Sequence, residues 1–268
     1  MQHLYKPSPS GESLYYAWFP AMHTRVDVAF YGTHTEEEWT NVARELQAEI
    51  HHLEQVGNYF DPLSELAGVN RMAHVRPLFI SEELFHILTL CQEYYIRTQG
   101  YFDISVQSFE HTPNTLRQMQ LHPEHGTLYL NDTDVRLNLS GFLKGYALDK
   151  IRPILQKHAI ENALINLGNS SILALGNHPL GKGWKLDADI TLHNQCLTTS
   201  GNDTDTRIHI INPRTGFPVS GKRQVKVITE SGAMGEAYST ALFACPDEQR
   251  PALLESLEGL IWNNSSSL

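Results

Sequence analysis

The sequence predicts an α+β fold, with mixed or largely antiparallel sheets and packed helices. Three observations support this class: amphipathic helical segments in the first hundred residues, a succession of short strand-like segments in the second half, and no internal repeat or separating linker. We expect one domain over residues 1–268, or two intimately joined lobes. A chain of 268 residues is long enough to fold around a core of its own.

The N-terminal segments alternate between extended and helical patterns. Residues 14–32 read as two extended segments around Pro20, since apolar and other side chains alternate there. Thr35 followed by Glu38 has the spacing of a capping box, so a helix is predicted over 35–56. Its apolar residues recur at helical spacing: Trp39, Val42, Ala43, Leu46, Ile50 and Leu53.

The middle of the chain mixes loops with shorter elements. Residues 57–72 carry turn signals and are predicted as a loop, and Ser81 begins a second amphipathic helix that ends before Gly100. A strand is predicted through 102–106. Residues 107–126 are polar and His-rich, and are expected to form an excursion or a short helix. A hairpin-like pair is expected at 127–130 and 134–139.

The second half of the chain is predicted to be rich in strands. A helix should begin near Lys144 or Gly145, with a kink at Pro153. Short strands are expected at 162–167, 171–176, 184–190, 207–212 and 223–229, and helices at 233–244 and 247–257.

Composition excludes several functional classes. The net charge is −10 and no block of Lys or Arg occurs, so a nucleic-acid partner is not expected. Three scattered cysteines favour neither a disulfide framework nor a zinc site. No segment has the length of a transmembrane helix. The N-terminus has no signal-peptide pattern, so the sequence as written predicts a cytoplasmic protein; a chain trimmed of an export signal, and so periplasmic or membrane-associated, would look the same.

Four polar segments are candidates for chemistry. In residues 140–145, Gly141 and Lys144 occupy a turn before a helix, where backbone N–H groups and a cation can receive a phosphate; the alternative is an ordinary strand-to-helix turn. The hydroxyl-rich segment 198–202 could line a polar pocket, although such clusters are usually turns. His209 is placed before a Pro/Gly turn as a possible general base, yet it is one of 14 histidines.

The fourth segment is 235–241, where Glu236 and Thr240 are four residues apart. A helix places both oxygens on one face, and a carboxylate with a hydroxyl suits Mg²⁺. The plainer interpretation is an exposed pair of helix side chains.

Taken together and in order, these segments resemble the FAD:protein FMN transferase family, the ApbE-type flavin transferases, from about Ala21 to Ala244. No single motif is decisive, and the order of the motifs carries the resemblance. The matching segments are Ala21–Thr24, Phe60–Glu65 with Asn70, Gly100–Ile104, Asn138–Asp149, Asn166–Gly168, Thr199–Gly201, His209–Ile211, Pro213–Gly216 and Ser239–Ala241.

The resemblance implies a flavin-transferase fold and roles for particular positions. Contacts with FAD are implied for Met22, Phe60, Tyr101, Phe102, Asp103, Asn138, Lys144 and Ile210. Metal ligation is implied for the Gly141 backbone carbonyl, Glu236 and Thr240, with Ser239 assisting, and His209 is the implied base.

The resemblance also implies a reaction. A threonine or serine hydroxyl of an acceptor protein would attack the FMN phosphorus of FAD, with Mg²⁺ on the pyrophosphate, and AMP would leave. Acceptors in the family are typically flavin-carrying subunits of redox complexes. Two alternatives stay open: an FAD-binding relative without transferase activity, and a metal-dependent FAD pyrophosphatase that yields FMN and AMP.

Several positions depart from the family pattern near the implied site. Glu236 stands where the family has a shorter aspartate, and Asn138 and Asn212 replace aspartates. Asn169 replaces a glycine, although asparagine tolerates positive φ, and His23 replaces the glycine after the methionine. These departures raise the question of altered acceptor choice or lowered activity.

Overall fold

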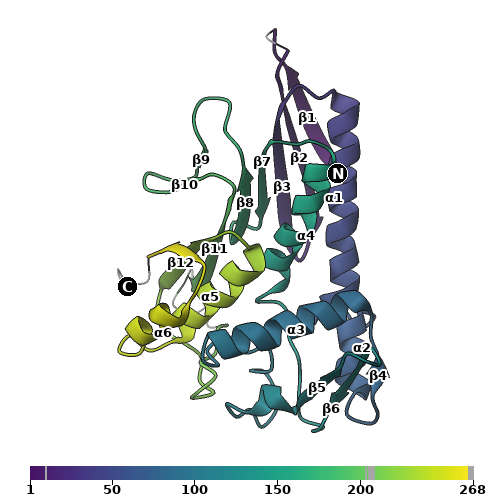
Figure 1. The fold of residues 1–268 in the computed structure, drawn as a ribbon, viewed down its shortest axis with the longest axis vertical. Coiled ribbons are helices and arrows are strands. Elements are labelled where there is room, and N and C mark those ends of the chain that lie inside the picture. The colour runs from purple at the N-terminus through teal and green to yellow at the C-terminus, as the bar shows by residue number, and fades with distance from the viewer. Residues whose placement is uncertain (10, 203, 205–208, 265–268) are drawn as a thin grey trace.

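The computed structural model describes residues 1–9, 11–202, 204 and 209–264. An eight-stranded sheet runs through it, and every neighbouring pair of strands in that sheet is antiparallel (Figure 1). In spatial order its strands are β1 (Gln2–Pro7), β2 (Ser13–Ala21), β3 (Thr24–Gly32), β7 (Asn162–Leu167), β8 (Ser171–Leu175), β11 (Gln195–Asn202), β12 (Arg223–Thr229) and β13 (Leu260–Asn263). The predicted α+β class with largely antiparallel sheets is confirmed.

Six α-helices occur in the described residues, and four of them, α1, α2, α3 and α5, begin at a side-chain cap. They are α1 (Glu36–Gly57), α2 (Glu65–Met72), α3 (Glu82–Arg97), α4 (Leu143–Lys157), α5 (Gly232–Ala244) and α6 (Arg250–Ser256). The predicted capping box of α1 is present: the Glu38 N–H donates to Thr35 Oγ1 at 3.3 Å, and the Thr35 N–H donates to Glu38 Oε2 at 2.8 Å. The Ser81 hydroxyl caps α3, because it accepts a hydrogen bond from the Leu84 N–H at 3.1 Å.

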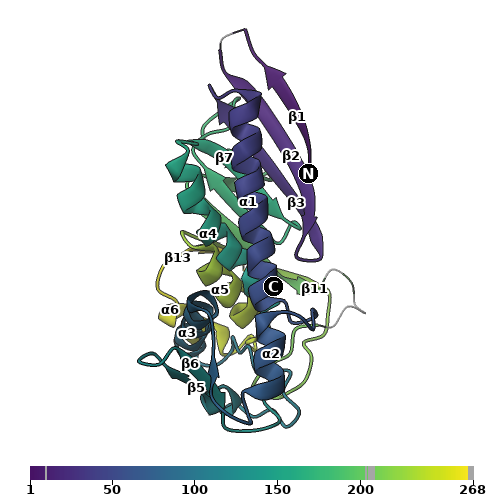
Figure 2. The ribbon, with the colours of Figure 1, turned by 90° about the vertical axis from the view of Figure 1, so that its right-hand side faces the viewer.

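Helices α1, α4 and α5 lie on one face of the large sheet (Figure 1, Figure 2). The strand side chains on that face and the apolar faces of these helices form the main core, with Trp39, Phe30 and Tyr15 fully buried in it. On the other face, a smaller cluster around Trp184 joins β9 (Trp184–Lys185) and β10 (Thr191–Leu192) to the sheet. Burial of these apolar surfaces is the main stabilising contribution to the fold.

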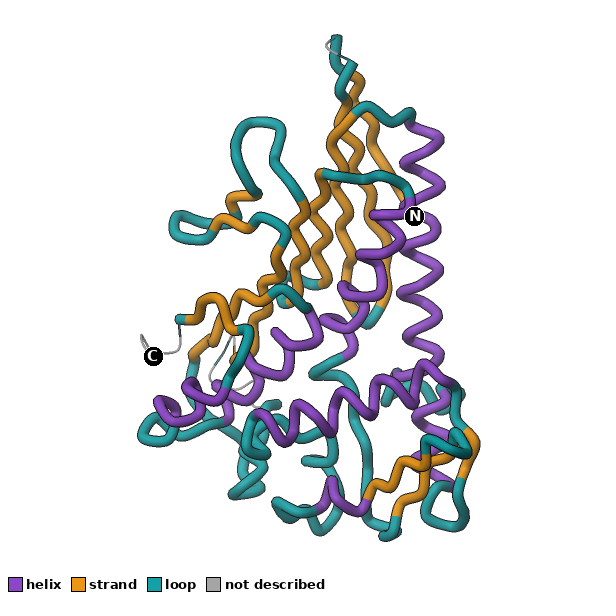
Figure 3. The backbone as a smooth tube through the Cα atoms, viewed as in Figure 1, coloured by secondary structure: helices purple, strands orange, loops and turns teal. Residues whose placement is uncertain are grey.

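A second, three-stranded sheet lies apart from the first, close to α2 and α3 (Figure 3). It consists of β4 (Leu78–Phe79), β6 (Thr127–Leu130) and β5 (Met119–His122), preceded by a 3₁₀ helix, η1 (Thr115–Gln118). The excursion predicted over 107–126 therefore ends in a strand that pairs with 127–130. No helix in the described part of the chain has the length and apolar character needed to cross a membrane.

Two predicted strands are turns or irregular segments. Residues 102–106 are not a strand, because Asp103 Oδ1 accepts the Ser105 N–H at 2.7 Å and bends the chain. Residues 134–139 are not the partner of 127–130. Instead the Asn70 side chain bonds both backbone groups of Leu137, at 2.8 and 2.9 Å, in place of a neighbouring strand.

Several other predicted elements also differ from the helices and strands of the structure. The predicted loop 57–72 contains α2, which Ser64 caps, and the segment 198–202 is the end of strand β11 rather than a turn. The strand predicted at 184–190 is limited to β9, whereas β1, β10 and β13 were not predicted. Of the strand predicted at 207–212, residues 207–208 lie outside the described residues and 209–212 hold only an isolated bridge, from Ile211 to Pro218.

Candidate active site

Helices α4 and α5 meet through glycines. A Cβ atom on Gly145 would lie 2.1 Å from the carbonyl oxygen of Gly232 and 2.5 Å from Cγ of Glu236. Contacts this short admit no side chain, so the two backbones approach as closely as glycine allows. The first turn of α4, the predicted phosphate-binding turn, is thereby set directly against the α5 residues predicted to hold a metal.

Glu236 is buried at this junction, with 4% of its surface exposed. Its Oε1 atom accepts a hydrogen bond from the Ser171 hydroxyl, and the Gly145 N–H also donates to the carboxylate. Burial raises the pKa of the Glu236 carboxyl, and the charge of Lys144 together with these hydrogen bonds opposes that rise. The carboxylate is therefore held in place in surroundings that favour an added positive charge.

A cluster of hydroxyl groups lies one helical turn further along α5. The Ser200 hydroxyl of β11 is 2.8 Å from the Ser239 hydroxyl and 3.1 Å from the Thr240 hydroxyl. A Cβ built on Gly141 would be 4.0 Å from Thr240 Oγ1, which places the exposed Gly141 beside this cluster. The structure therefore brings together Gly141, Ser239 and Thr240, while Glu236 turns toward Ser171 and Gly145.

The donors at this junction fit a hard divalent cation. They are a buried carboxylate, a threonine hydroxyl and an exposed glycine backbone, which are the oxygen ligands that Mg²⁺ prefers. Both hydrogen bonds to Glu236 leave acceptor capacity on a carboxylate, which has about four lone-pair positions. Among the described residues no group of three or more His, Cys, Asp or Glu could hold a metal, and the predicted set includes only one such side chain.

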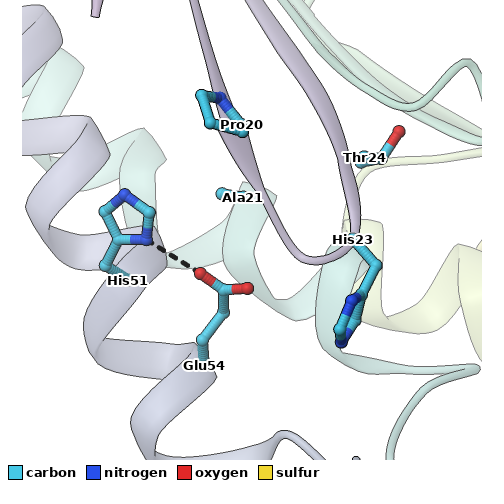
Figure 4. Close-up of a pocket in the computed structure, with 6 residues that line it drawn as sticks. All are labelled: Pro20, Ala21, His23, Thr24, His51 and Glu54. Atoms are coloured by element: carbon cyan, nitrogen blue, oxygen red, sulfur yellow. Dashed lines mark hydrogen bonds and ion pairs between the residues drawn. The ribbon is translucent and has the colours of Figure 1, made fainter.

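Met22 and Phe60, both predicted FAD contacts, lie near the turn between β2 and β3. The Met22 N–H donates to Glu54 Oε1 at 2.6 Å, and the exposed Phe60 ring packs edge-on against His23 with ring centroids 5.8 Å apart. A cavity of about 350 Å³ opens beside this turn. Figure 4 shows its lining residues, Pro20, Ala21, His23, Thr24, His51 and Glu54.

Tyr101, Phe102 and Asp103, which are also predicted FAD contacts, are buried. Tyr101 is 1% exposed and Phe102 is 3% exposed, and both pack in the main core. Asp103 is engaged by Ser105 and by His111, whose Nε2 is 2.9 Å from its Oδ2.

Asn138 and Lys144 flank the turn at the start of α4. Asn138 Oδ1 accepts the Ser140 N–H at 2.9 Å, and its amide nitrogen donates to Gln107 Oε1 at 2.7 Å. The Asn138 amide thus makes two hydrogen bonds that shape the turn. An aspartate at this position could accept the Ser140 N–H but could not donate to Gln107. Lys144 is half-buried, and its positive charge acts to lower the pKa of the Glu236 carboxyl.

His209 and Ile210 lie on an irregular segment and not on the predicted strand. Ile210 is half-buried against the main core, and its carbonyl accepts the Val219 N–H at 2.8 Å. His209 is exposed. The loop after Ile211 contacts the segment that follows the C-terminal end of α3. The Arg214 guanidinium lies 4.6 Å from the centroid of the Tyr101 ring and donates to the Gln99 carbonyl at 3.1 Å.

Two residues of the junction, Ser171 and Ser200, were not among the predicted site residues. Ser200 lies in the segment 198–202, and the signals for it were the hydroxyl content of that segment and the family match at Thr199–Gly201. Ser171 follows the β7–β8 turn and meets Glu236, 65 positions later in the sequence, only because β8 runs beneath α5. No local pattern marks such a contact.

The family model and the relatives found by comparison with known proteins agree with one another. Residues 22–261 match a family model described as the ApbE family. A protein of Chlamydia trachomatis named FAD:protein FMN transferase is 26% identical over 262 residues, which cover 84% of this chain and 80% of that protein. A protein of the same name from Treponema pallidum is 25% identical over 251 residues, covering 74% and 69% of the two chains.

Solved structures share the fold. The flavin transferase ApbE from Vibrio cholerae superposes with a TM-score of 0.78 at 17% identity and covers 91% of each chain. The apo form of the Pseudomonas stutzeri flavinyl transferase ApbE gives a TM-score of 0.80 at 16% identity, covering 93% of this chain and 90% of that one. At these identities the likeness concerns the fold.

Proposed function

The chain belongs to the ApbE family, and from this premise we propose that it is an FAD:protein FMN transferase, which moves the FMN half of FAD onto a hydroxyl group of an acceptor protein and releases AMP. The observation that carries the proposal is the α4–α5 junction, where a buried carboxylate, a hydroxyl cluster and a helix start converge. The names of the relatives support it.

The proposed reaction is a transfer at phosphorus. The acceptor hydroxyl oxygen forms a bond to the FMN phosphorus, the bond from that phosphorus to the AMP oxygen breaks, and the hydroxyl proton passes to a base. His209 is our candidate for that base, since neutral imidazole accepts a proton near pH 7. The acceptor we propose is a flavin-carrying subunit of a redox complex that presents a threonine or serine.

Gly141 through its carbonyl, Glu236 and Thr240, with Ser239 assisting, are the residues that would hold Mg²⁺. When bound, the ion supplies positive charge to the pyrophosphate and to the departing AMP. The protein's own part is to position and to neutralise: the α4 start and Lys144 attract the anionic pyrophosphate, and the Ser171 and Gly145 bonds fix the Glu236 carboxylate. The Ser200 hydroxyl orients those of Ser239 and Thr240.

A direct assay tests the proposal. The purified protein is mixed with FAD and Mg²⁺, with and without a threonine-bearing acceptor peptide, and AMP and covalently bound flavin are measured. We expect AMP release together with flavin on the peptide. AMP with free FMN and no labelled peptide would indicate a pyrophosphatase, and FAD that is bound but left intact would indicate a binding protein; either result contradicts the transferase.

Replacing Lys144 by alanine is expected to raise the Kd for FAD about five- to tenfold, because one charge-assisted contact with the pyrophosphate is lost. Fluorescence titration of FAD measures this. Lys157→Ala is the matched control, since it removes the same charge from the opposite end of α4, where Lys157 pairs with Glu45 at 2.9 Å. Equal affinities for the two variants would remove Lys144 from the site.

A further inference from the structure

Strands β1, β2 and β3 are covered on one face only. Because side chains alternate along a strand, Tyr15, Ala17 and Phe19 of β2 point into the main core beneath α1, and the residues between them lie on the opposite face. No helix of the described chain lies over that opposite face (Figure 1, Figure 2). The cluster around Trp184 reaches along it only as far as Ala29 of β3. This part of the large sheet is therefore left without a second layer.

The uncovered face is rich in the side chains that dominate protein interfaces. Tyrosine, tryptophan and arginine carry a large share of the binding energy in such interfaces. The strand register brings them together here, since Leu14 of β2 pairs with Tyr31 of β3 and Leu4 of β1 pairs with Tyr16. Leu4 is 64% exposed. We call this surface the aromatic face, and its residues are Leu4, Leu14, Tyr16, Trp18, Arg25 and Tyr31.

The centre of the aromatic face is held in place by its own contacts. The Arg25 guanidinium lies 5.3 Å from the centroid of the Trp18 ring, and it donates to the Tyr16 hydroxyl at 2.6 Å and to Asp27 Oδ1 at 2.8 Å. The Tyr16 hydroxyl also donates to Asp27, and the Tyr16 and Trp18 rings are 5.4 Å apart. Side chains that are already fixed lose little freedom when a partner binds, which lowers the cost of association.

The charges on and beside the aromatic face balance. Arg25 and Lys6 are positive, whereas Asp27 and Glu12 are negative, and Glu12 accepts a hydrogen bond from the Tyr31 hydroxyl. A neutral surface does not select nucleic acid or an anionic membrane, since both require clustered cations. The whole chain has a net charge of −10, so two copies repel each other except where the surface is neutral. A two-fold contact between two such faces can place the cations of one copy against the anions of the other.

The geometry of the sheet favours contact through faces rather than through edges. β1 is the terminal strand of the described sheet, but Pro7 has no N–H and Lys6 is charged, and both features oppose pairing with a further strand. Strands β2 and β3 each have nine residues, so three strands give a face of roughly 30 by 14 Å, or about 400 Å². Two copies would bury roughly 800 Å², less than the ~1,200 Å² of stable complexes.

We propose that the aromatic face binds the same face of a second copy of this chain, in a two-fold symmetric dimer. The small area makes the dimer weak, with a Kd on the order of 10 μM. The inference does not depend on the proposed reaction, because it uses no residue of the α4–α5 junction.

Sedimentation of the full chain between about 1 and 100 μM tests the dimer. We expect a shift from monomer to dimer with concentration, and a lower Kd at high NaCl concentration, because salt screens the repulsion between the two net charges. Arg25→Glu places a second negative charge beside Asp27 and should raise the Kd at least about tenfold. The Arg25 side chain is 56% exposed, so the Tm should change by no more than about 2 °C.

Two further variants locate the contact. Trp18→Glu should also raise the Kd at least about tenfold, and Arg25→Glu decides the matter if Trp18→Glu lowers the Tm. Trp262→Glu is the matched control, since Trp262 is 37% exposed on β13 at the other end of the sheet, and its Kd should equal that of the parent.

Three outcomes would overturn the inference. The parent chain could be monomeric at every concentration. A dimer could be weakened by Trp262→Glu and not by Arg25→Glu, which would place the contact at the other end of the sheet. The chain could also be monomeric while Arg25→Glu raises the KM for an acceptor protein, which would assign the aromatic face to that acceptor.

Discussion

Replacing Glu236 by glutamine is expected to lower the rate of Mg²⁺-dependent AMP release by at least about 100-fold while the chain stays folded. The substitution keeps the volume and the acceptor oxygen for the Ser171 hydroxyl, but removes the carboxylate that is proposed to hold the ion. Steady-state AMP release across a range of Mg²⁺ concentrations measures the effect.

Glu83→Gln is the control for loss of a partly buried carboxylate. Glu83 pairs with Lys150 at 2.7 Å on the α3–α4 side of the core and is not part of the proposed site. Turnover per folded molecule should be unchanged in this variant. Full activity of Glu236→Gln at saturating Mg²⁺ would show that Glu236 is not a ligand.

The same glutamine variant should be more stable than the parent at pH 7 when no Mg²⁺ is present. Burial raises the pKa of Glu236 in the folded state, so its contribution to stability is present below the unfolded pKa of about 4.3 and is lost as the pH rises through the folded pKa. At pH 7 the folded chain therefore holds a poorly solvated charge that glutamine removes. We expect a Tm higher by about 2–4 °C at pH 7, with the gain shrinking toward pH 4. A calorimetric Tm below that of the parent at pH 7 would contradict this.

Gly145→Ala is expected to lower the free energy of unfolding by about 3 kcal/mol, which corresponds to a Tm lower by about 6–12 °C, and to abolish transfer. The added methyl group would lie 2.1 Å from the Gly232 carbonyl oxygen, which is backbone and has no alternative rotamer. Helices α4 and α5 would have to separate, and Glu236 and Thr240 would move away from the first turn of α4.

Gly68→Ala provides a control of opposite sign. Gly68 lies within α2, and a Cβ there would meet only the Arg71 side chain, at 4.0 Å. Alanine in a helix interior is favoured over glycine by about 0.5–1 kcal/mol, so this variant should be slightly more stable. Thermal unfolding of both variants tests the contrast, and a Gly145→Ala chain with the parent's Tm would mean that the two helices do not meet as described.

Local signals predicted the elements whose formation depends on neighbouring residues. The capping box at Thr35 and Glu38 and the cap at Ser81 could be read from the sequence because their bonds span three residues. Strand 102–106 was predicted wrongly because its apolar alternation was outweighed by the turn that the Asp103 side chain makes. The β11 strand was taken for a turn because hydroxyl-rich sequences occur in both, and only its partners β8 and β12 decide between them.

Some residues of the candidate site could likewise be identified from the sequence, and others could not. Gly141 and Thr240 could be identified through a family motif, and the structure places them side by side. The partner of Glu236, by contrast, follows from the register of β8 under α5, which no local pattern encodes. Tyr101 and Phe102 belong to a segment that the motif marks, yet their burial depends on packing against distant helices.

The strands of the large sheet lie side by side in the order in which the ribosome makes them, so the sheet can fold during synthesis. From β1 to β13, each strand takes its place beside the one made before it, so the sheet can grow at a single edge as translation proceeds. Lys144 and Ser171 emerge early, but α5 emerges only with residues 232–244. A nascent chain thus displays an unpaired β8 or β12 edge for much of its synthesis and completes the α4–α5 junction only near the end. Chains released early would be expected to aggregate rather than act as partial enzymes.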